Sequence, residues 1–194
     1  MIASMTSMVP PDERYGAAVE RHEPVPSFEA IVARYERPIY AFLRRMSGSP
    51  EDAADLTQET FLKAYRAIER TGDDLNVGAW LHRIAGNTCR DLLRRRKRIA
   101  WSSWDFAAYE LPSTRRNDDP EALLLGAETQ QRVRQVLLTL SPRQRQALIL
   151  REYVGLSCAE IGAQLGVSEG AVKAILFRAR EEFRKRYARQ EAQE

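Results

Sequence analysis

The stretch SCAEIGAQLGVSEGAVKAILFRAR, residues 157–180, decides the fold of the C-terminal part of the chain. Ser157 is followed three positions later by a glutamate, a capping box that starts one helix, and Ser168 supplies the cap of a second helix. Between the two helices, Gly166 can adopt the left-handed turn conformation, and the small Gly162 lets the helices cross closely. The spacing therefore predicts a helix-turn-helix.

The second helix of this motif has two distinct faces. Its apolar spacing predicts burial of Val172, Leu176, Ala179 and Phe183. The opposite face, turned toward the DNA major groove, carries Lys173, Ala174, Phe177 and Arg178, with Arg180 and Arg184 closer to the phosphates. An ordinary helical hairpin with solvated charges is the alternative. The capped starts, the glycine turn and the basic second helix together favour DNA binding.

Working upstream, cap signals predict two more helices in the same domain. Asp119 and Pro120 are the cap and first residue of one helix, and Ser141 with Pro142 opens the next, which runs through Tyr153. We therefore expect a helical domain over residues 120–187, followed by a short tail, residues 188–194.

The N-terminal half shows a second group of helical patterns. Apolar residues from Phe28 to Met46 step by threes and fours, so we expect a helix that Pro38 kinks or divides and that Gly48 stops. Ser49 then caps a helix from Pro50 to about Arg70. Its predicted buried stripe consists of Phe61, Leu62, Tyr65 and Ile68.

A glycine- and aspartate-containing loop, residues 71–78, precedes a third helix from Ala79 to about Arg98. Its predicted buried residues are Leu81, Ile84, Ala85 and Leu92, Trp80 is expected in the core, and His82 is expected on the surface. This first domain spans 27–98. A mobile tail, 1–26, precedes it, and a linker, 99–119, follows. The predicted fold is all-α, with two small helical domains joined by a flexible linker.

Composition excludes several classes of protein. Cys89 and Cys158 lie far apart, with no neighbouring cysteine or histidine, so neither a disulfide framework nor a metal site is supported. We therefore expect a reducing compartment, the cytoplasm. The apolar stretches are too short for a membrane span. No phosphate-binding or dinucleotide-binding glycine motif, GxSxG or metal-ligand cluster occurs, so we predict a protein that is not an enzyme and has no cofactor.

Charge is placed unevenly along the chain, although the net charge is only +3. Basic residues dominate 90–98 and 173–189, whereas 51–60 carries four acidic residues and no basic one. Basic faces suit nucleic acid, and an acidic helix suits a basic protein partner. We therefore expect two kinds of partner.

Both halves also resemble one family. Residues 52–65, 80–88 and 91–96 are similar to region two of the extracytoplasmic-function (ECF) sigma factors, and 140–180 contains motifs similar to region four. The resemblance implies a subunit that binds the beta and beta-prime subunits of core RNA polymerase, recognises the minus-35 element as duplex and melts the minus-10 element. It also implies promoter DNA and an anti-sigma protein as partners, and we expect a monomer when free.

The resemblance assigns residues to each surface. The core-polymerase contacts are Asp55, Gln58, Glu59 and Lys63; the minus-10 contacts are Asn87, Arg94, Arg95 and Arg96; and the minus-35 contacts are Ser168, Lys173, Ala174, Phe177, Arg178 and Arg180. Ala174 and Ile175 stand where the family commonly has Ser and Arg, so the usual minus-35 sequence is not expected. A solvated polar face on residues 50–70, a structural role for Asn87, and a helix-turn-helix repressor or activator acting without core polymerase are the alternatives.

Overall fold

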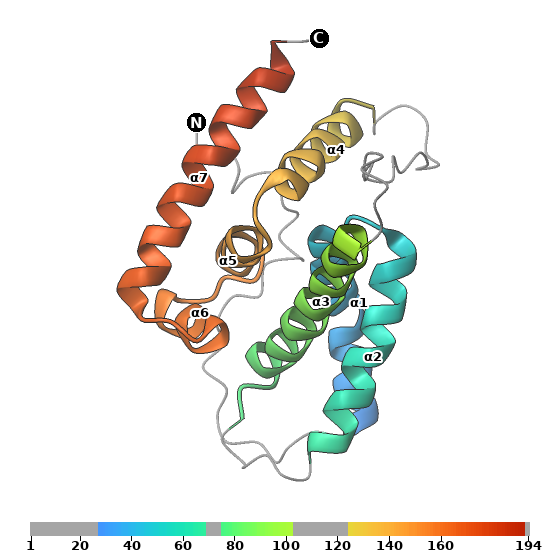
Figure 1. The fold of residues 1–194 in the computed structure, drawn as a ribbon. Helices are drawn as coiled ribbons and strands as arrows, with labels where there is room; N and C mark the ends of the chain where they lie inside the picture. The colour runs from blue at the N-terminus through green and yellow to red at the C-terminus, as the bar shows by residue number, and fades with distance from the viewer. Residues whose placement is uncertain (1–26, 69–74, 103–123, 193–194) are drawn as a thin grey trace.

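The computed structural model describes residues 27–68, 75–102 and 124–192, and in these ranges the secondary structure is entirely α-helical. The helices are α1 (Phe28–Ser47), α2 (Pro50–Ile68), α3 (Val77–Ser102), α4 (Leu124–Thr139), α5 (Pro142–Glu152), α6 (Cys158–Leu165) and α7 (Glu169–Glu191) (Figure 1). The all-α prediction is confirmed. The predicted tail 1–26 and most of the predicted linker lie outside the described residues.

The first unit consists of α1, α2 and α3, which all pack against one another. Ser27 caps α1 by accepting a hydrogen bond from the backbone N–H of Ala30, and Gly48 ends the helix with φ of 84°. Pro38 lies inside α1 without dividing it. Only the left-handed conformation of Gly48 allows the chain to turn at once into α2.

The predicted buried stripe of α2 was wrong at two of its four positions. Leu62 is 58% exposed and Tyr65 is 62% exposed. The buried residues of α2 are instead Ala53, Leu56, Thr57, Thr60, Phe61 and Ala64. The threonine hydroxyls donate to carbonyl oxygens one turn back, so these polar side chains can be buried. Sequence spacing placed the apolar stripe too far around the helix.

The prediction for α3 was right on its apolar face and wrong on its histidine. Leu81 and Ala85 are buried as predicted, and Trp80 is half-buried at the edge of the core. His82, predicted on the surface, is only 3% exposed. Its Nδ1 lies 2.7 Å from the carbonyl oxygen of Gly78, and its ring meets the edge of Phe42.

The bounds of α3 also differ from the prediction. The helix begins at Val77, within the predicted loop, because the Asn76 side chain accepts a hydrogen bond from the backbone N–H of Ala79. At its other end the helix continues to Ser102 instead of stopping near Arg98.

The second unit contains α4 to α7, and the predicted caps of its last three helices are confirmed. The predicted cap of its first helix, Asp119 with Pro120, lies outside the described residues. Ser141 and Ser157 both form complete capping boxes, and Ser168 accepts a hydrogen bond from the backbone N–H of Ala171. Helix α7 packs against α4, α5 and α6 and runs along one side of the molecule (Figure 1).

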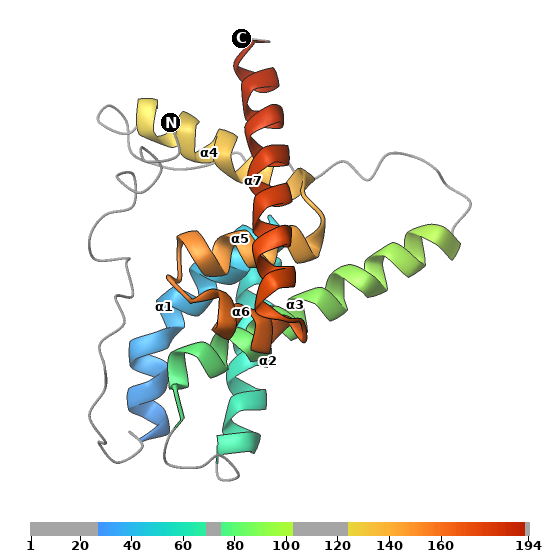
Figure 2. The same cartoon turned by 90° about the vertical axis from the view of Figure 1, so that its left-hand side faces the viewer.

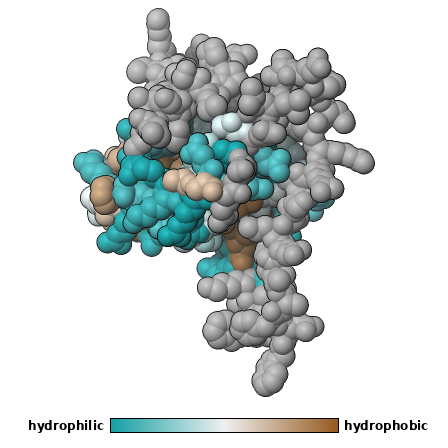
Figure 3. All heavy atoms as spheres, turned by 90° about the horizontal axis from the view of Figure 1, so that it is seen from above, coloured by the Kyte–Doolittle hydropathy of each residue, from teal (hydrophilic) through white to brown (hydrophobic). Residues whose placement is uncertain are grey.

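The two units pack directly against each other. Helix α1 contacts α4 and α5, and α3 contacts α5 (Figure 2). The buried apolar side chains of both units form one continuous core. On the face seen in Figure 3, the described surface is mainly hydrophilic, with a few hydrophobic side chains between the polar ones. Among the described helices, none is both long and apolar enough to cross a bilayer.

Candidate nucleic-acid and polymerase interfaces

Helices α6 and α7 form the predicted helix-turn-helix. Gly166 has φ of 65°, the left-handed conformation that ends α6. Gly162 lies so close to the turn that a Cβ there would be 2.7 Å from the carbonyl oxygen of Val167. Glycine is therefore required at position 166 by the backbone conformation and at position 162 by close packing.

The two faces of α7 also agree with the prediction. Val172, Leu176, Ala179 and Phe183 are buried. Lys173, Ala174, Phe177 and Arg178 are exposed, and Phe177, at 67%, is the most exposed large hydrophobic side chain among the described residues. Ile175 is partly buried. An exposed helix face of this composition can enter a major groove.

The charged side chains of α7 differ in how they are held. Lys173 pairs with Glu169 at 2.7 Å, and this hydrogen bond raises the pKa of the lysine. Arg180 pairs with Glu152 of α5, and Arg184 pairs with Glu181. Arg178 has no ion pair within the described residues and is exposed on the same face of α7 as Ala174 and Phe177.

The predicted polymerase contacts gather on one face of α2. Asp55 and Gln58 are exposed, and Glu59 pairs with Lys63 at 2.7 Å. Lys63 also donates to the hydroxyl of Thr88 on α3 at 3.1 Å. Asp55 and Glu59 line an open groove of about 280 Å³ between α2 and α3. This groove offers carboxylates to a basic partner.

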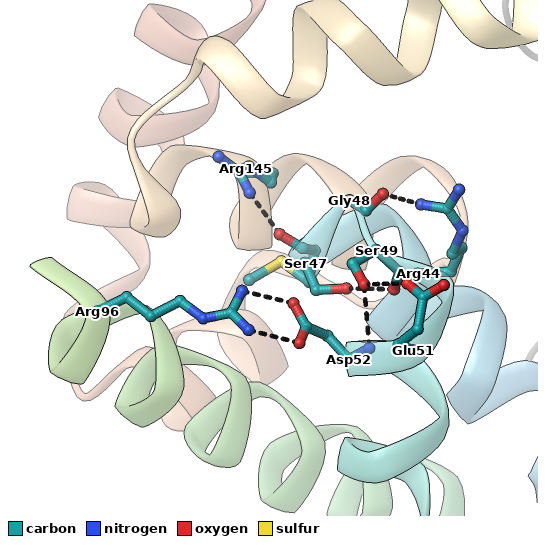
Figure 4. A network of polar contacts seen from close by, with 9 residues as sticks. Arg44, Ser47, Gly48, Ser49, Glu51, Asp52, Arg96 and Arg145 are labelled. Carbon is teal, nitrogen blue, oxygen red and sulfur yellow. Dashed lines mark hydrogen bonds and ion pairs between the residues drawn. The ribbon is translucent and has the colours of Figure 1, made fainter. Parts of the chain in front are cut away.

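The three arginines at the basic end of α3, which were all predicted to contact DNA, have different surroundings in the structure. Arg96 makes two 2.6 Å hydrogen bonds to the carboxylate of Asp52 (Figure 4). Arg95 lines the same groove, and Arg94 is exposed and pairs with Asp91. The structure therefore brings Arg95 and Arg96 to the acidic groove, and sequence analysis missed the Asp52 contact because the two residues lie far apart in the chain.

Asn87 is exposed on α3, and its side-chain oxygen accepts a hydrogen bond from Arg90. Burial lowers the pKa of Arg90, and the nearby positive charge of Arg143 on α5 lowers it further. A polar amide beside a guanidinium can bind a base edge or a phosphate.

The cysteines are placed as small hydrophobic residues. Both are free; Cys89 is buried and Cys158 is half-buried. Burial raises the pKa of the Cys89 thiol to about 12. Within the ranges that the structure describes, no group of His, Cys, Asp and Glu could hold a metal ion.

Sequence analysis gave no role to Arg145, which the structure places where the two units meet. Its guanidinium is buried and donates to the carbonyl oxygens of Leu137, Leu138 and Leu140, near the end of α4, and of Met46, near the end of α1. Figure 4 shows Arg145 with its hydrogen bond toward the end of α1. Exposed carbonyls at helix ends carry partial negative charge, so this cation caps two helices at once. No local sequence pattern predicts a contact between an arginine and the carbonyl oxygens of two distant helix ends.

Comparison with known proteins agrees with the division of the chain into two helical units. The sequence models of sigma-70 region 2 and sigma-70 region 4 match residues 31–99 and 130–183. The ECF RNA polymerase sigma factor SigE of Mycolicibacterium smegmatis is 35% identical, over 90% of this chain and 68% of that protein. The ECF RNA polymerase sigma-E factor of Escherichia coli K12 is 35% identical, over 80% of this chain and 83% of that protein.

A solved structure has a similar fold. The sigma factor RpoE of Bartonella quintana, crystallised with the anti-sigma factor NepR, matches with a TM-score of 0.70 and 26% identity, over 84% of this chain and 97% of that one.

Fold and surfaces thus define a two-domain helical promoter-recognition protein of the sigma-70 type. The chain belongs to the ECF sigma factor family, as the extent and identity of the matches show. A promoter-directing function is supported over that of an independent repressor, because both domains match this family in the right order.

Proposed function

We propose that this ECF sigma factor joins core RNA polymerase through the α2 face defined by Asp55, Gln58, Glu59 and Lys63. The support is physical: the carboxylates lie on an exposed helix face and line a groove open to solvent. Acidic groups in that position can pair with arginines of the beta-prime and beta subunits. The proposed activity is recognition and not catalysis, and it takes place in the cytoplasm with the polymerase.

We assign promoter recognition to α7 and α3. Lys173, Ala174, Phe177 and Arg178 would enter the major groove of the minus-35 duplex, while Ser168 and Arg180 lie closer to its backbone. Asn87 would bind a minus-10 base taken out of the stack. Arg94 is better placed for DNA than Arg95 and Arg96, which line the acidic groove.

We also propose an anti-sigma protein as the inhibitory partner. The Bartonella sigma factor that this chain resembles over most of its length was crystallised with one. Such a partner would cover the polymerase-binding or DNA-binding surfaces, and the free chain would be a monomer.

The single observation that carries the proposal is one chain with an acidic helix face on its first domain and a basic helix-turn-helix on its second. The test is transcription by bacterial core polymerase with and without the purified protein, on a promoter from upstream of its own gene. Transcripts that start specifically and require the protein are expected. Tight specific binding to DNA without any association with core polymerase would contradict the proposal.

The polymerase contact has its own test. Asp55→Arg combined with Glu59→Arg should abolish co-purification with core polymerase while leaving the helical circular dichroism spectrum intact, because like charges would replace complementary ones. The matched control reverses two exposed acids of α1, Glu29→Arg with Glu36→Arg, and should retain the polymerase. Retention of the polymerase by the α2 double variant would refute this contact.

A further inference from the structure

The exposed face of α7 has an apolar centre over its first turns. Gly170, Ala174 and Phe177 follow one another at spacings of four and three residues, so they lie along one line on the helix surface. All three are exposed, and a Cβ at Gly170 would meet nothing within 4 Å. None of the three side chains contains a hydrogen-bonding atom. At its centre, this face can therefore contact a partner through apolar side chains alone.

Charged side chains lie on both sides of this line. On one side, Lys173 pairs with Glu169 at 2.7 Å, so much of its charge is compensated within the helix. On the other side, Arg178 is exposed and has no ion pair within the described residues. Ile175 packs against the core and leaves the exposed face to its neighbours. The face thus combines one unpaired guanidinium with a methyl group and a phenyl ring.

The chemistry of the major groove determines which base suits such a face. Among the four bases, thymine alone presents a methyl group there, at its C5 atom. The other base edges present mainly nitrogen and oxygen atoms, and an apolar side chain would cover these atoms without replacing the hydrogen bonds that they make to water. An apolar surface therefore selects thymine twice, by contact with its methyl group and by the penalty against the other bases.

The positions of the two side chains along α7 also suit base contacts. The N-terminal part of a recognition helix is the part that reaches base edges, and Ala174 and Phe177 lie in the first half of α7. Three residues of helix span about 4.5 Å, close to the step of about 3.4 Å between base pairs. The methyl group and the ring can therefore meet neighbouring base pairs, with Arg178 beside them.

We propose that Ala174 and Phe177 select thymine in the minus-35 element through its C5-methyl group, next to a guanine or phosphate bound by Arg178. This inference rests on the proposed function, because it names what the proposed minus-35 surface reads. Both side chains determine specificity, since they favour one base over the others without supplying a hydrogen bond.

The test compares two promoter duplexes that differ only in methyl groups. The promoter from upstream of the protein's own gene carries either thymidine or deoxyuridine at every thymine position of the minus-35 element, in both strands. Deoxyuridine keeps the pairing with adenine and lacks the C5-methyl group. Holoenzyme formed from the full chain and bacterial core polymerase is titrated with each duplex at one salt concentration. It should bind the deoxyuridine duplex about fourfold more weakly for each methyl group contacted, since burying one apolar carbon contributes about 0.8 kcal/mol.

A variant of the protein assigns this preference to the apolar face. Phe177→Ala should bind the thymidine duplex more weakly and lose most of the preference for it, because the ring and the methyl group act as a pair. The ring is 67% exposed, so the variant should keep its fold, which circular dichroism checks. Lys185→Ala removes an exposed cation farther along α7 and is the matched control. It should weaken binding to both duplexes equally and keep the preference.

Equal affinity of the wild-type holoenzyme for the two duplexes would overturn the inference, and so would a minus-35 element without any A·T pair. Loss of core-polymerase binding by Phe177→Ala in the absence of DNA would assign the exposed ring to a protein contact and would also overturn it. Deoxyuridine placed between the two promoter elements should have no effect. The proposed function would stand in all these cases, since it fails only if the wild-type protein forms no holoenzyme that recognises the promoter.

Discussion

At the scale of single residues, His82 shows how burial changes chemistry. The side chain is enclosed by the first domain, and burial lowers its pKa to about 4 from the ordinary 6.5, although the bond to the Gly78 carbonyl opposes the shift. The imidazole is therefore neutral in the folded protein at any pH above about 4, while an unfolded chain binds a proton there below about 6.5.

The pH dependence of stability follows from this difference. Between pH 6.5 and 4 the unfolded state binds more protons at this position, so the free energy of unfolding should fall as the pH falls, by about 3 kcal/mol at most. Above pH 6.5 the contribution of His82 is fully present. Urea unfolding at several pH values measures the effect.

His82→Asn is the control, because its amide can donate to the Gly78 carbonyl but does not titrate. Its stability should depend less steeply on pH over this window than that of the wild type. Two parallel curves would show that His82 is accessible to protons in the folded state.

Arg178 is the residue with which the proposed minus-35 contact is most directly tested. It is exposed on α7 and has no ion pair among the described residues, so its guanidinium can reach a base edge or phosphate. Arg178→Ala should weaken promoter binding by the holoenzyme about tenfold or more at fixed salt. Arg189→Ala removes an exposed arginine near the far end of the same helix and should have a smaller effect; equal effects would argue against a specific contact.

At the scale of helices, the close crossing of α6 and α7 requires a glycine at position 162, whereas the glycine at position 170 can be replaced. Gly162→Ala would push a methyl group against the Val167 carbonyl, whereas a Cβ at Gly170 meets nothing within 4 Å. We expect Gly162→Ala to destabilise the protein by about 1–3 kcal/mol and Gly170→Ala to be neutral or slightly stabilising. Thermal unfolding distinguishes them, and similar melting temperatures would contradict the close crossing.

The helices that sequence predicted best are those with local signals. Ser141, Ser157 and Ser168 cap their helices as predicted, because a cap and its partner lie within one turn of each other. The buried and exposed faces of α7 were likewise predictable from spacing. The α2 stripe was not, because Leu62 and Tyr65 have the apolar character of core residues but remain mostly exposed, and Tyr65 only packs edge-on against Phe28 at the start of α1.

Contacts between residues that lie far apart in the chain could not be predicted, because they depend on how the helices pack. Asp52 and Arg96, like Gly86 and Gln146, come together only after the helices have packed. In the sequence, Arg96 belongs to a basic run typical of DNA binding, and nothing local indicates that a carboxylate of α2 holds it. The exposed face of α7 was therefore predicted residue by residue, whereas the contact that holds Arg96 against Asp52 could be found only in the structure.

At the scale of the whole molecule, the stability of the second domain is tied to the first through Arg145. Its guanidinium satisfies carbonyl oxygens at the end of α4 and reaches the Met46 carbonyl at the end of α1. Three of its four carbonyl partners belong to the second domain. The domain boundaries that we propose, 27–98 and 120–187, therefore separate units that share one buried cation.

Arg145→Met should consequently destabilise the second domain more than the first. The substitution leaves buried carbonyl oxygens without donors, which should cost about 3 kcal/mol or more. In amide hydrogen exchange, protection should fall mainly in α4 and α5 and only slightly in α1, since α1 loses a single bond. Arg143→Met, which removes an exposed arginine of the same helix, should change protection little. An equal loss of protection throughout α1 to α7 would contradict this expectation and would mean that both domains, which share one continuous core, unfold as one cooperative unit.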